Sequence, residues 1–302
     1  MTALRLPSAS IVAMFVLTGV GVGLVVSCNR LATTGGVPFI PFVFWESVIG
    51  GGAMLTILLA RRRRPGLTPG HLRAYAVIGA IGICVPYTIM AMIASKLPAG
   101  ILALQLALVP MATYVIAMVL RMDRLELRRT AGLLLGLGGV LLILLPEASL
   151  PAPEMRLWLL VGLVVPMCIA TSIIACEHYP PPESGAVEFA CGLMLTAAIF
   201  MVPVMAISGS WWVFTAPLDW ADGSVVLAGL IVAMCWAFAF EIIRRAGSVF
   251  YSTVLYLETL AGVGWGIVIF GEHHAAWVWI SLVLLLGGIT LVNRRATSTP
   301  AS

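Results

Sequence analysis

Long apolar stretches alternate with short polar connections along the whole chain. Ten of them approach the roughly 20 apolar residues that a helix needs to cross a bilayer. The bounds that we predict are 9–29, 38–60, 72–94, 98–120, 127–145, 155–177, 185–208, 222–243, 248–270 and 274–293. Each stretch must be helical, because lipid offers no partner for an unpaired backbone group. The pattern therefore predicts an all-α integral membrane protein with ten transmembrane helices and no soluble domain.

The same pattern occurs twice. Residues 95–144 and 244–293 align at a constant shift of about 149 residues. Each copy runs from a basic residue through two apolar helices, joined by a short acidic loop, to a pair of glycines. A repeat of about half the chain length determines the architecture. We therefore predict two five-helix halves, residues 1–147 and 148–302.

The positions of Lys and Arg predict the orientation. With the N-terminus inside, 14 of the 17 basic residues fall in cytoplasmic connections, and the others are Arg30, Lys96 and Arg156. The positive-inside rule then places both termini in the cytoplasm. Five helices per half is an odd number, so the halves have opposite orientations. Such an inverted repeat is typical of transporters that work by alternating access; a duplicated scaffold without transport is the alternative.

Composition excludes several other classes. Of the 302 residues 61% are hydrophobic and 10% are charged, against about 25% charged in a soluble domain. The basic residues are grouped at helix ends, so nucleic acid is not an expected partner. No glycine-rich loop with Lys-Ser/Thr is present, and neither ATP hydrolysis nor a cofactor is expected. We expect no removable signal peptide.

Cysteine and histidine give no pattern of metal ligands. The six cysteines lie within or at the ends of apolar segments without paired spacing. They are interpreted as small buried residues, not as disulfides or a zinc site. His273 and His274 are adjacent, which does not suit a helical zinc site, and we interpret them as solvated loop residues.

Glutamates inside the apolar stretches are the main functional candidates, because an ionisable side chain at membrane depth is costly. Glu258 lies about ten residues into the ninth helix, near the middle of the bilayer. We predict that it pairs with an amine of the ligand or carries a proton. The alternative is a neutral Glu held by an interhelical hydrogen bond. Glu46 in the second helix is the second candidate, whereas Glu188 and Glu241 lie near helix ends, where an interfacial position suffices.

Aromatic and polar residues at mid-depth complete the predicted site. The repeat shift pairs Tyr87 in the third helix with Trp236 in the eighth. Aromatic faces with hydrogen-bonding tips suit a small, partly apolar organic solute. The predicted substrate-binding residues are Glu258, Glu46, Tyr87, Gln105, Trp236, Trp45, Tyr114 and Tyr256. Trp45 also fits an interfacial aromatic belt.

Prolines and glycines within the helices predict bends and close packing. Interruptions that free backbone carbonyls are expected at Pro86, Pro110 and Pro166. Small-xxx-small spacing, which lets helices approach closely, occurs at Gly132/Gly136 and Gly262/Gly266.

The first copy reads LPAGILALQLALVP, then an acidic loop and GLLLGLGGVLL, and the second reads FGEHHAAWVWISLVLLLGGITL. Both resemble the EamA-type repeat of the drug/metabolite transporter (DMT) superfamily, most clearly in helices four, five, nine and ten. The resemblance implies ten helices in two inverted repeats, cytoplasmic termini, and an inner-membrane exporter of amino acids, related metabolites or drugs. Three features depart from the family pattern. Glu46 stands where many members carry Arg, Thr259 stands where proline is expected, and the first loop keeps its acidic position only as Asp123.

We therefore predict a secondary active transporter of the bacterial inner membrane that exports amino acids or related small metabolites by alternating access. The expected partners are a small-molecule solute and the lipid bilayer. Proton coupling stays open, as does the choice between monomer and homodimer. A multidrug or cationic-compound exporter and a passive facilitator are the alternative functions. An enzyme would need a cluster of nucleophile, base or metal ligands, which the sequence does not supply.

Overall fold

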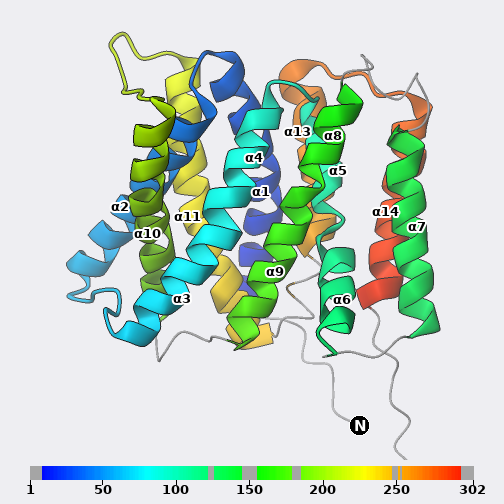
Figure 1. Cartoon of the computed structure of the whole chain (residues 1–302), viewed down its shortest axis with the longest axis horizontal. Helices are drawn as coiled ribbons and strands as arrows, with labels where there is room; N and C mark the ends of the chain where they lie inside the picture. Colours follow the sequence, from blue (N-terminus) through cyan, green and yellow to red (C-terminus); the bar gives the residue numbers. More distant parts are fainter. Residues whose placement is uncertain are drawn as a thin grey trace, which may run out of the picture.

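The structure is a computed structural model that describes residues 9–121, 126–144, 155–178, 185–246, 251 and 254–293. All regular elements in these ranges are helices (Figure 1). Their bounds are α1 (Ala9–Thr34), α2 (Phe39–Ala60), α3 (Pro69–Gly79), the π-helix η1 (Ala80–Cys84), α4 (Val85–Ala94), α5 (Ala99–Leu106), α6 (Val109–Val119), α7 (Leu127–Leu144), α8 (Met155–Gly162), α9 (Val164–His178), α10 (Ala186–Ser208), α11 (Trp220–Ala246), α13 (Val254–Phe270) and α14 (Ala276–Asn293).

These helices confirm the ten predicted membrane crossings. Within the described ranges, seven spans are long and apolar enough to cross a bilayer, and three of them are composites of α3–η1–α4, α5–α6 and α8–α9. Three shorter apolar helices lie within α7, α13 and α14. The observed ends differ from the predicted ends by a few residues. At α1 the helix continues from the predicted end at residue 29 to Thr34, and the hydroxyls of Thr33 and Thr34 bond to the carbonyls of Asn29 and Arg30.

The three composite spans are interrupted where prolines predicted it. η1 ends two residues before Pro86, a turn at residues 107–108 precedes Pro110, and a turn at Leu163 precedes Pro166. Proline lacks a backbone N–H and its ring displaces the carbonyl four residues earlier, so each break leaves a carbonyl without its usual partner. At the third break the N–H of Leu163 bonds to the carbonyl of Leu160 at 3.1 Å, and the carbonyl of Leu159 accepts a hydrogen bond from Gln105 Nε2 at 2.9 Å.

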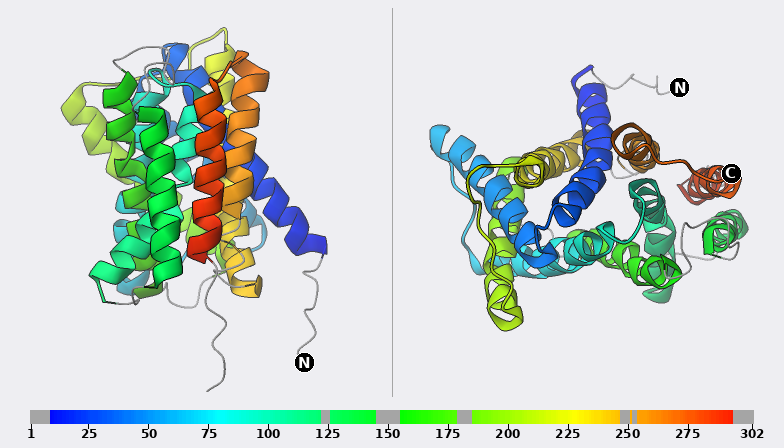
Figure 2. Two further views of the ribbon diagram at one scale, coloured as in Figure 1. Left: turned by 90° about the vertical axis from the view of Figure 1, so that its right-hand side faces the viewer. Right: turned by 90° about the horizontal axis from the view of Figure 1, so that it is seen from above.

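The helices of the two halves pack against one another as related pairs. α2 packs on its repeat counterpart α10, and α7 on its counterpart α14. α1 packs on α11 and α13, and its counterpart α9 packs correspondingly on α4 and α6. Seen from above, α7 and α14 stand together at one side of the bundle (Figure 2). The exchange of contacts between halves agrees with an inverted repeat; the boundary at 147/148 stays a prediction.

Figure 1 places the start of α1 and the end of α14 at the same end of the bundle. We call this the inner end and the opposite one the outer end. The α2–α3 connection with Arg61 to Arg64 and the end of α11 with Arg245 also lie at the inner end, whereas Lys96 lies in the α4–α5 connection at the outer end. The segregation of basic residues agrees with a cytoplasmic inner end.

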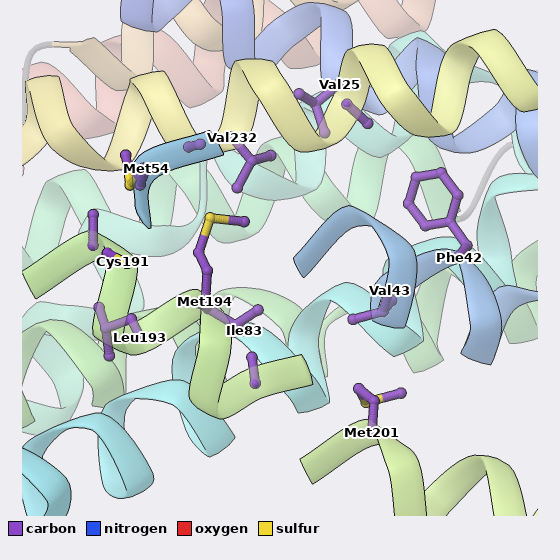
Figure 3. Packing of buried hydrophobic residues seen from close by; sticks show 14 of the residues in the cluster. Val25, Phe42, Val43, Met54, Ile83, Cys191, Leu193, Met194, Met201 and Val232 are labelled. Atoms are coloured by element: carbon purple, nitrogen blue, oxygen red, sulfur yellow. The ribbon is translucent and has the colours of Figure 1, made fainter. Parts of the chain in front are cut away.

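Two buried apolar clusters hold the bundle together. One joins α1, α2, η1, α10 and α11, where side chains such as Val25, Phe42, Met194 and Val232 converge (Figure 3). The other joins α4, α5, α6, α8, α13 and α14 and contains Leu102, Tyr114 and Leu285. Because lipid tails are as apolar as these side chains, close packing rather than the hydrophobic effect distinguishes the interior.

Small residues create that close packing. Gly23 on α1 faces Gly262 on α13, and a Cβ at Gly23 would lie 2.7 Å from the backbone nitrogen of Gly262. Gly288 on α14 approaches α7 similarly, since a Cβ there would lie 2.6 Å from the carbonyl oxygen of Gly132 and 3.0 Å from the nitrogen of Gly136. Both predicted glycine sets therefore lie at helix–helix contacts.

Candidate functional site

Two glutamates from different halves are buried within the membrane-spanning bundle. Glu46 on α2 is 1% exposed and Glu258 on α13 is 8% exposed. Among the residues that the structure describes, neither carboxylate oxygen of Glu46 has a hydrogen-bond partner. α11 crosses α2 at this level, since a Cβ at Gly229 would lie 2.8 Å from the carbonyl oxygen of Glu46. Glycine at that position lets a helix of the second half approach the turn that carries Glu46.

Tyr87 on α4 lies near both glutamates. It also lies near the side chain of Trp236 on α11. The indole ring of Trp236 stacks on Phe240 with ring centroids 5.7 Å apart. The structure thus brings together Glu46, Tyr87, Trp236 and Glu258, which come from four helices and both halves.

No described positive side chain lies close enough to act on either carboxylate. Arg30, the basic residue of α1, pairs with Glu272 at the outer end instead. A buried, unpaired carboxylate costs several kcal/mol in apolar surroundings unless a cation or a proton neutralises it. The arrangement is therefore suited to take up a positive group.

The other predicted site residues have different surroundings. Gln105 donates to the carbonyl of Leu159 at the break between α8 and α9. The indole of Trp45 donates to the carbonyl of Trp212 at 3.0 Å, and its ring packs on Phe214. The hydroxyl of Tyr114 accepts a hydrogen bond from the backbone of Glu126 at the α6–α7 connection. The side chain of Tyr256 lies outside the described part of the chain.

The sequence did not single out the polar neighbours of the central site. Cys28 on α1 lies near Glu46, and Cys235 on α11 lies near Glu258 and Tyr87. The hydroxyl of Ser27, next to Cys28, is buried without a hydrogen-bond partner. Small polar residues of this kind are common in membrane helices, and only the tertiary contacts distinguish these from the rest.

Both glutamates that were expected near helix ends form ion pairs there. Glu188 forms an ion pair of 3.1 Å with the exposed Arg63 at the inner end, and Glu241 pairs with Arg245 one turn later on α11. Exposed pairs of this kind contribute little to stability. Among the described residues, five cysteines are free thiols, and no group of three or more His, Cys, Asp or Glu side chains is placed to hold a metal ion.

The interpretation of His274 as a solvated loop residue was wrong. Its side chain is only 4% exposed, and its Nε2 lies 3.2 Å from Oε2 of Glu272. The ring also packs edge-on against Trp279. The loop folds inward here because Gly271 adopts a left-handed conformation, with φ of +61°, which turns the chain back toward α5. His273 is exposed, as expected.

Comparison with known proteins identifies the family. Residues 9–145 and 156–294 each match the sequence model of the EamA-like transporter family. The chain belongs to this family. The two matches cover nearly all of it and confirm the resemblance of both halves to EamA repeats. No curated protein matches the chain. A crystal structure of another protein covers 92% of this chain and 96% of its own, with 22% identity and a TM-score of 0.58, which is a likeness of fold alone.

Family membership establishes the general activity. EamA proteins are transporters of the DMT type, so this chain is a multi-pass membrane protein that moves small-molecule solutes across a bilayer. The match is to transporters and not to enzymes. It names no solute, direction or coupling ion.

Proposed function

We propose that this EamA protein is a secondary active transporter that exports small amine-bearing solutes, such as amino acids or related metabolites, across the bacterial inner membrane. The observation that carries the proposal is the pair of buried carboxylates, Glu46 and Glu258, which come from opposite halves and both lie near Tyr87. In an inverted repeat, the midplane between the halves is where a solute is exposed to each side in turn.

Glu258 is assigned the recognition of the amine. An ammonium group within hydrogen-bonding distance would neutralise its charge and make a charge-assisted hydrogen bond. When the solute leaves, the carboxylate must face water or take up a proton, because a bare charge in the closed bundle costs several kcal/mol. The same residue therefore couples exit of the amine to entry of a proton. Glu46 is the second residue of this kind.

The aromatic residues supply the apolar part of the site. The Trp236 ring presents a face to a solute and also attracts a cation through its quadrupole. The Tyr87 hydroxyl, near the Trp236 side chain and both glutamates, orients polar groups. A mixed wall of this type favours solutes with both a positive group and an apolar portion.

Organic cations are the second class of solute that one observation favours. An amino acid carries a carboxylate as well as an ammonium group, and no described Lys or Arg acts on the central site to receive the carboxylate. Cationic amines and drugs lack that requirement. A passive facilitator with the same site would move solute only downhill and without a response to a pH gradient.

The test is a thermal-shift screen of the purified protein against amino acids, nucleosides and cationic drugs, followed by uptake into proteoliposomes under an imposed pH gradient. A ligand at 100 times its dissociation constant stabilises the folded state by about 2.7 kcal/mol. The expected result is a hit that Glu258→Gln loses, with more than about tenfold slower transport, corresponding to about 1.4 kcal/mol. Glu188→Gln makes the same chemical change at an interfacial ion pair and should retain both responses.

The outcomes separate the alternatives. A response to amino acids that disappears in Glu258→Gln supports metabolite export, and a response only to cations supports the second class. Wild-type transport and binding in Glu258→Gln would refute the role of this glutamate. Transport that ignores the pH gradient would refute proton coupling and favour a facilitator.

A further inference from the structure

A second polar cluster lies at the outer end, in the connection between α13 and α14. Glu272 is its centre, with a side chain that is 6% exposed. Its Oε1 accepts a hydrogen bond from the backbone N–H of Ala99 at 2.6 Å, and its Oε2 accepts one from Gly100 at 3.0 Å. Arg30 forms an ion pair with Oε1, and His274 lies beside Oε2.

These partners belong to different parts of the bundle. Ala99 and Gly100 are the first residues of α5, and Arg30 lies near the outer end of α1. Both helices belong to the first half, whereas Glu272 belongs to the second. The guanidinium of Arg30 also stacks over the ring of Phe270, 4.4 Å from its centroid. One carboxylate therefore fastens α1, α5 and the α13–α14 connection together.

The contact of α13 with α1 and α5 beneath Glu272, here called the seam, consists of small residues. A Cβ at Gly266 on α13 would lie 3.0 Å from the backbone nitrogen of Gly100, and a Cβ at Gly262 would run into Ala103 on α5. Gly262 also faces Gly23 on α1. From Gly23 up to Glu272 the three helices thus touch through glycines and the small side chain of Ala103. No solute passes through such a seam unless α13 separates from α1 and α5.

Breaking the contacts of the Glu272 carboxylate costs free energy. A carboxylate that accepts two backbone hydrogen bonds and pairs with a guanidinium has charge-assisted bonds, which are about twice as strong as neutral ones. Burial by itself raises the pKa of Glu272, but His274, the N–H groups of Gly100 and Ala99, and the charge of Arg30 lower it below its ordinary value. The carboxylate is therefore ionised at neutral pH, in the form that makes these bonds.

We propose that Glu272 is the latch of an outer gate: it closes the outer end while the central site faces the inner end, and its bonds to α5 and α1 must break before solute is released outside. The proposal rests on alternating access but not on the identity of the solute. It gives the short acidic loop of the second repeat a role in transport that is separate from recognition by Glu258.

Labelling of Cys28 tests the latch directly. Cys28 is 1% exposed, lies two residues below Arg30 on α1, and is near Glu46. In a variant that keeps only this cysteine, a membrane-impermeant maleimide added from outside should react slowly. Glu272→Gln removes the charge and one acceptor oxygen. We expect its labelling rate to rise about tenfold, which corresponds to about 1.4 kcal/mol toward the open state.

Two controls make the result specific. Glu188→Gln, at the inner end, should leave Cys28 labelling at the wild-type rate. A protein that keeps only Cys191, which is buried between α10 and α2 with its Sγ on the carbonyl of Gly51, should stay unlabelled in Glu272→Gln. Labelling of Cys191 would indicate general loosening of the fold and would overturn the interpretation as a gate.

A second variant guards against failure to fold. If Glu272→Gln does not accumulate in membranes, Arg30→Gln removes the ion pair but leaves both backbone hydrogen bonds, and a smaller rise is expected. No increase in Cys28 labelling in a folded variant of either residue would refute the latch. Labelling of Cys28 needs no solute, so this test is independent of the transport test with Glu258→Gln. Either test can fail while the other succeeds.

Discussion

The contact between Gly23 and α13 allows a quantitative prediction. A methyl group at Gly23 would place its carbon 2.7 Å from the nitrogen of Gly262 and 2.9 Å from the Cβ of Ala261. Non-bonded carbon contacts normally lie at about 3.5–4.0 Å. α1 and α13 would therefore have to separate by about 0.8 Å, because helix backbone, unlike the end of a flexible side chain, cannot move aside locally.

The expected loss of stability in Gly23→Ala is about 1–3 kcal/mol, the usual cost of forcing extra atoms into a packed interior. Gly264 on α13 is the matched control, since a Cβ there would meet nothing within 4 Å. Gly264→Ala should be neutral or gain up to about 1 kcal/mol from the better helix propensity of alanine. The two variants differ from wild type by the same methyl group, and only Gly23→Ala should lose stability.

The assay is the unfolding midpoint of purified protein in mild detergent, by thermal or denaturant titration, with each variant measured beside wild type. A Gly23→Ala protein as stable as wild type would contradict the close approach of α1 and α13. Equal destabilisation by Gly264→Ala would show that glycine matters for some reason other than packing.

Two further predictions concern Gln105 and the pH dependence of Glu272. Gln105→Met should lower the free energy of unfolding by about 1–3 kcal/mol, because the carbonyl of Leu159 loses its donor. Transport should stay unchanged. A loss of transport without a loss of stability would show that Gln105 contacts the solute. For Glu272, whose pKa is lowered on folding, the stabilisation is complete above its ordinary pKa and is lost as pH falls through the folded value. The groups that face its carboxylate are Arg30 and His274, and α5 contributes only backbone N–H groups. The gap in unfolding free energy between wild type and Glu272→Gln should therefore be constant above the ordinary pKa of glutamate, about 4.5, and should shrink as the pH falls below it. A gap that stays unchanged at low pH would contradict the assignment.

The predictions from sequence were best for features that depend only on the order of residues along the chain. A helix forms all of its backbone hydrogen bonds within one segment, as lipid requires. The lengths of the apolar stretches therefore predicted the ten spans. The breaks near Pro86, Pro110 and Pro166 followed from the missing N–H. The glycine sets predicted close helix contacts because small residues are what such contacts require.

The candidate site was only partly within reach. Glu46 and Glu258 stood out because a carboxylate at membrane depth is costly wherever it points, and the repeat shift paired Tyr87 with Trp236. The free-energy cost of burying a carboxylate does not reveal which helices pack against each other. For the same reason Gln105, Trp45 and Tyr114 were grouped with the site, although each has a backbone partner elsewhere.

The outer end shows most clearly what only the tertiary structure decided. In the sequence, Glu272 and His274 are polar residues in a short loop, and such residues are usually solvated. Their burial depends on the left-handed turn at Gly271 and on α5 and α1, whose contacting residues lie about 170 and 240 positions away. Local pattern fixed the helices and the costly charges within them, because both depend on the residue and its solvent. The pairing of those charges depends on contacts between distant segments, which the packing of the two halves alone determines.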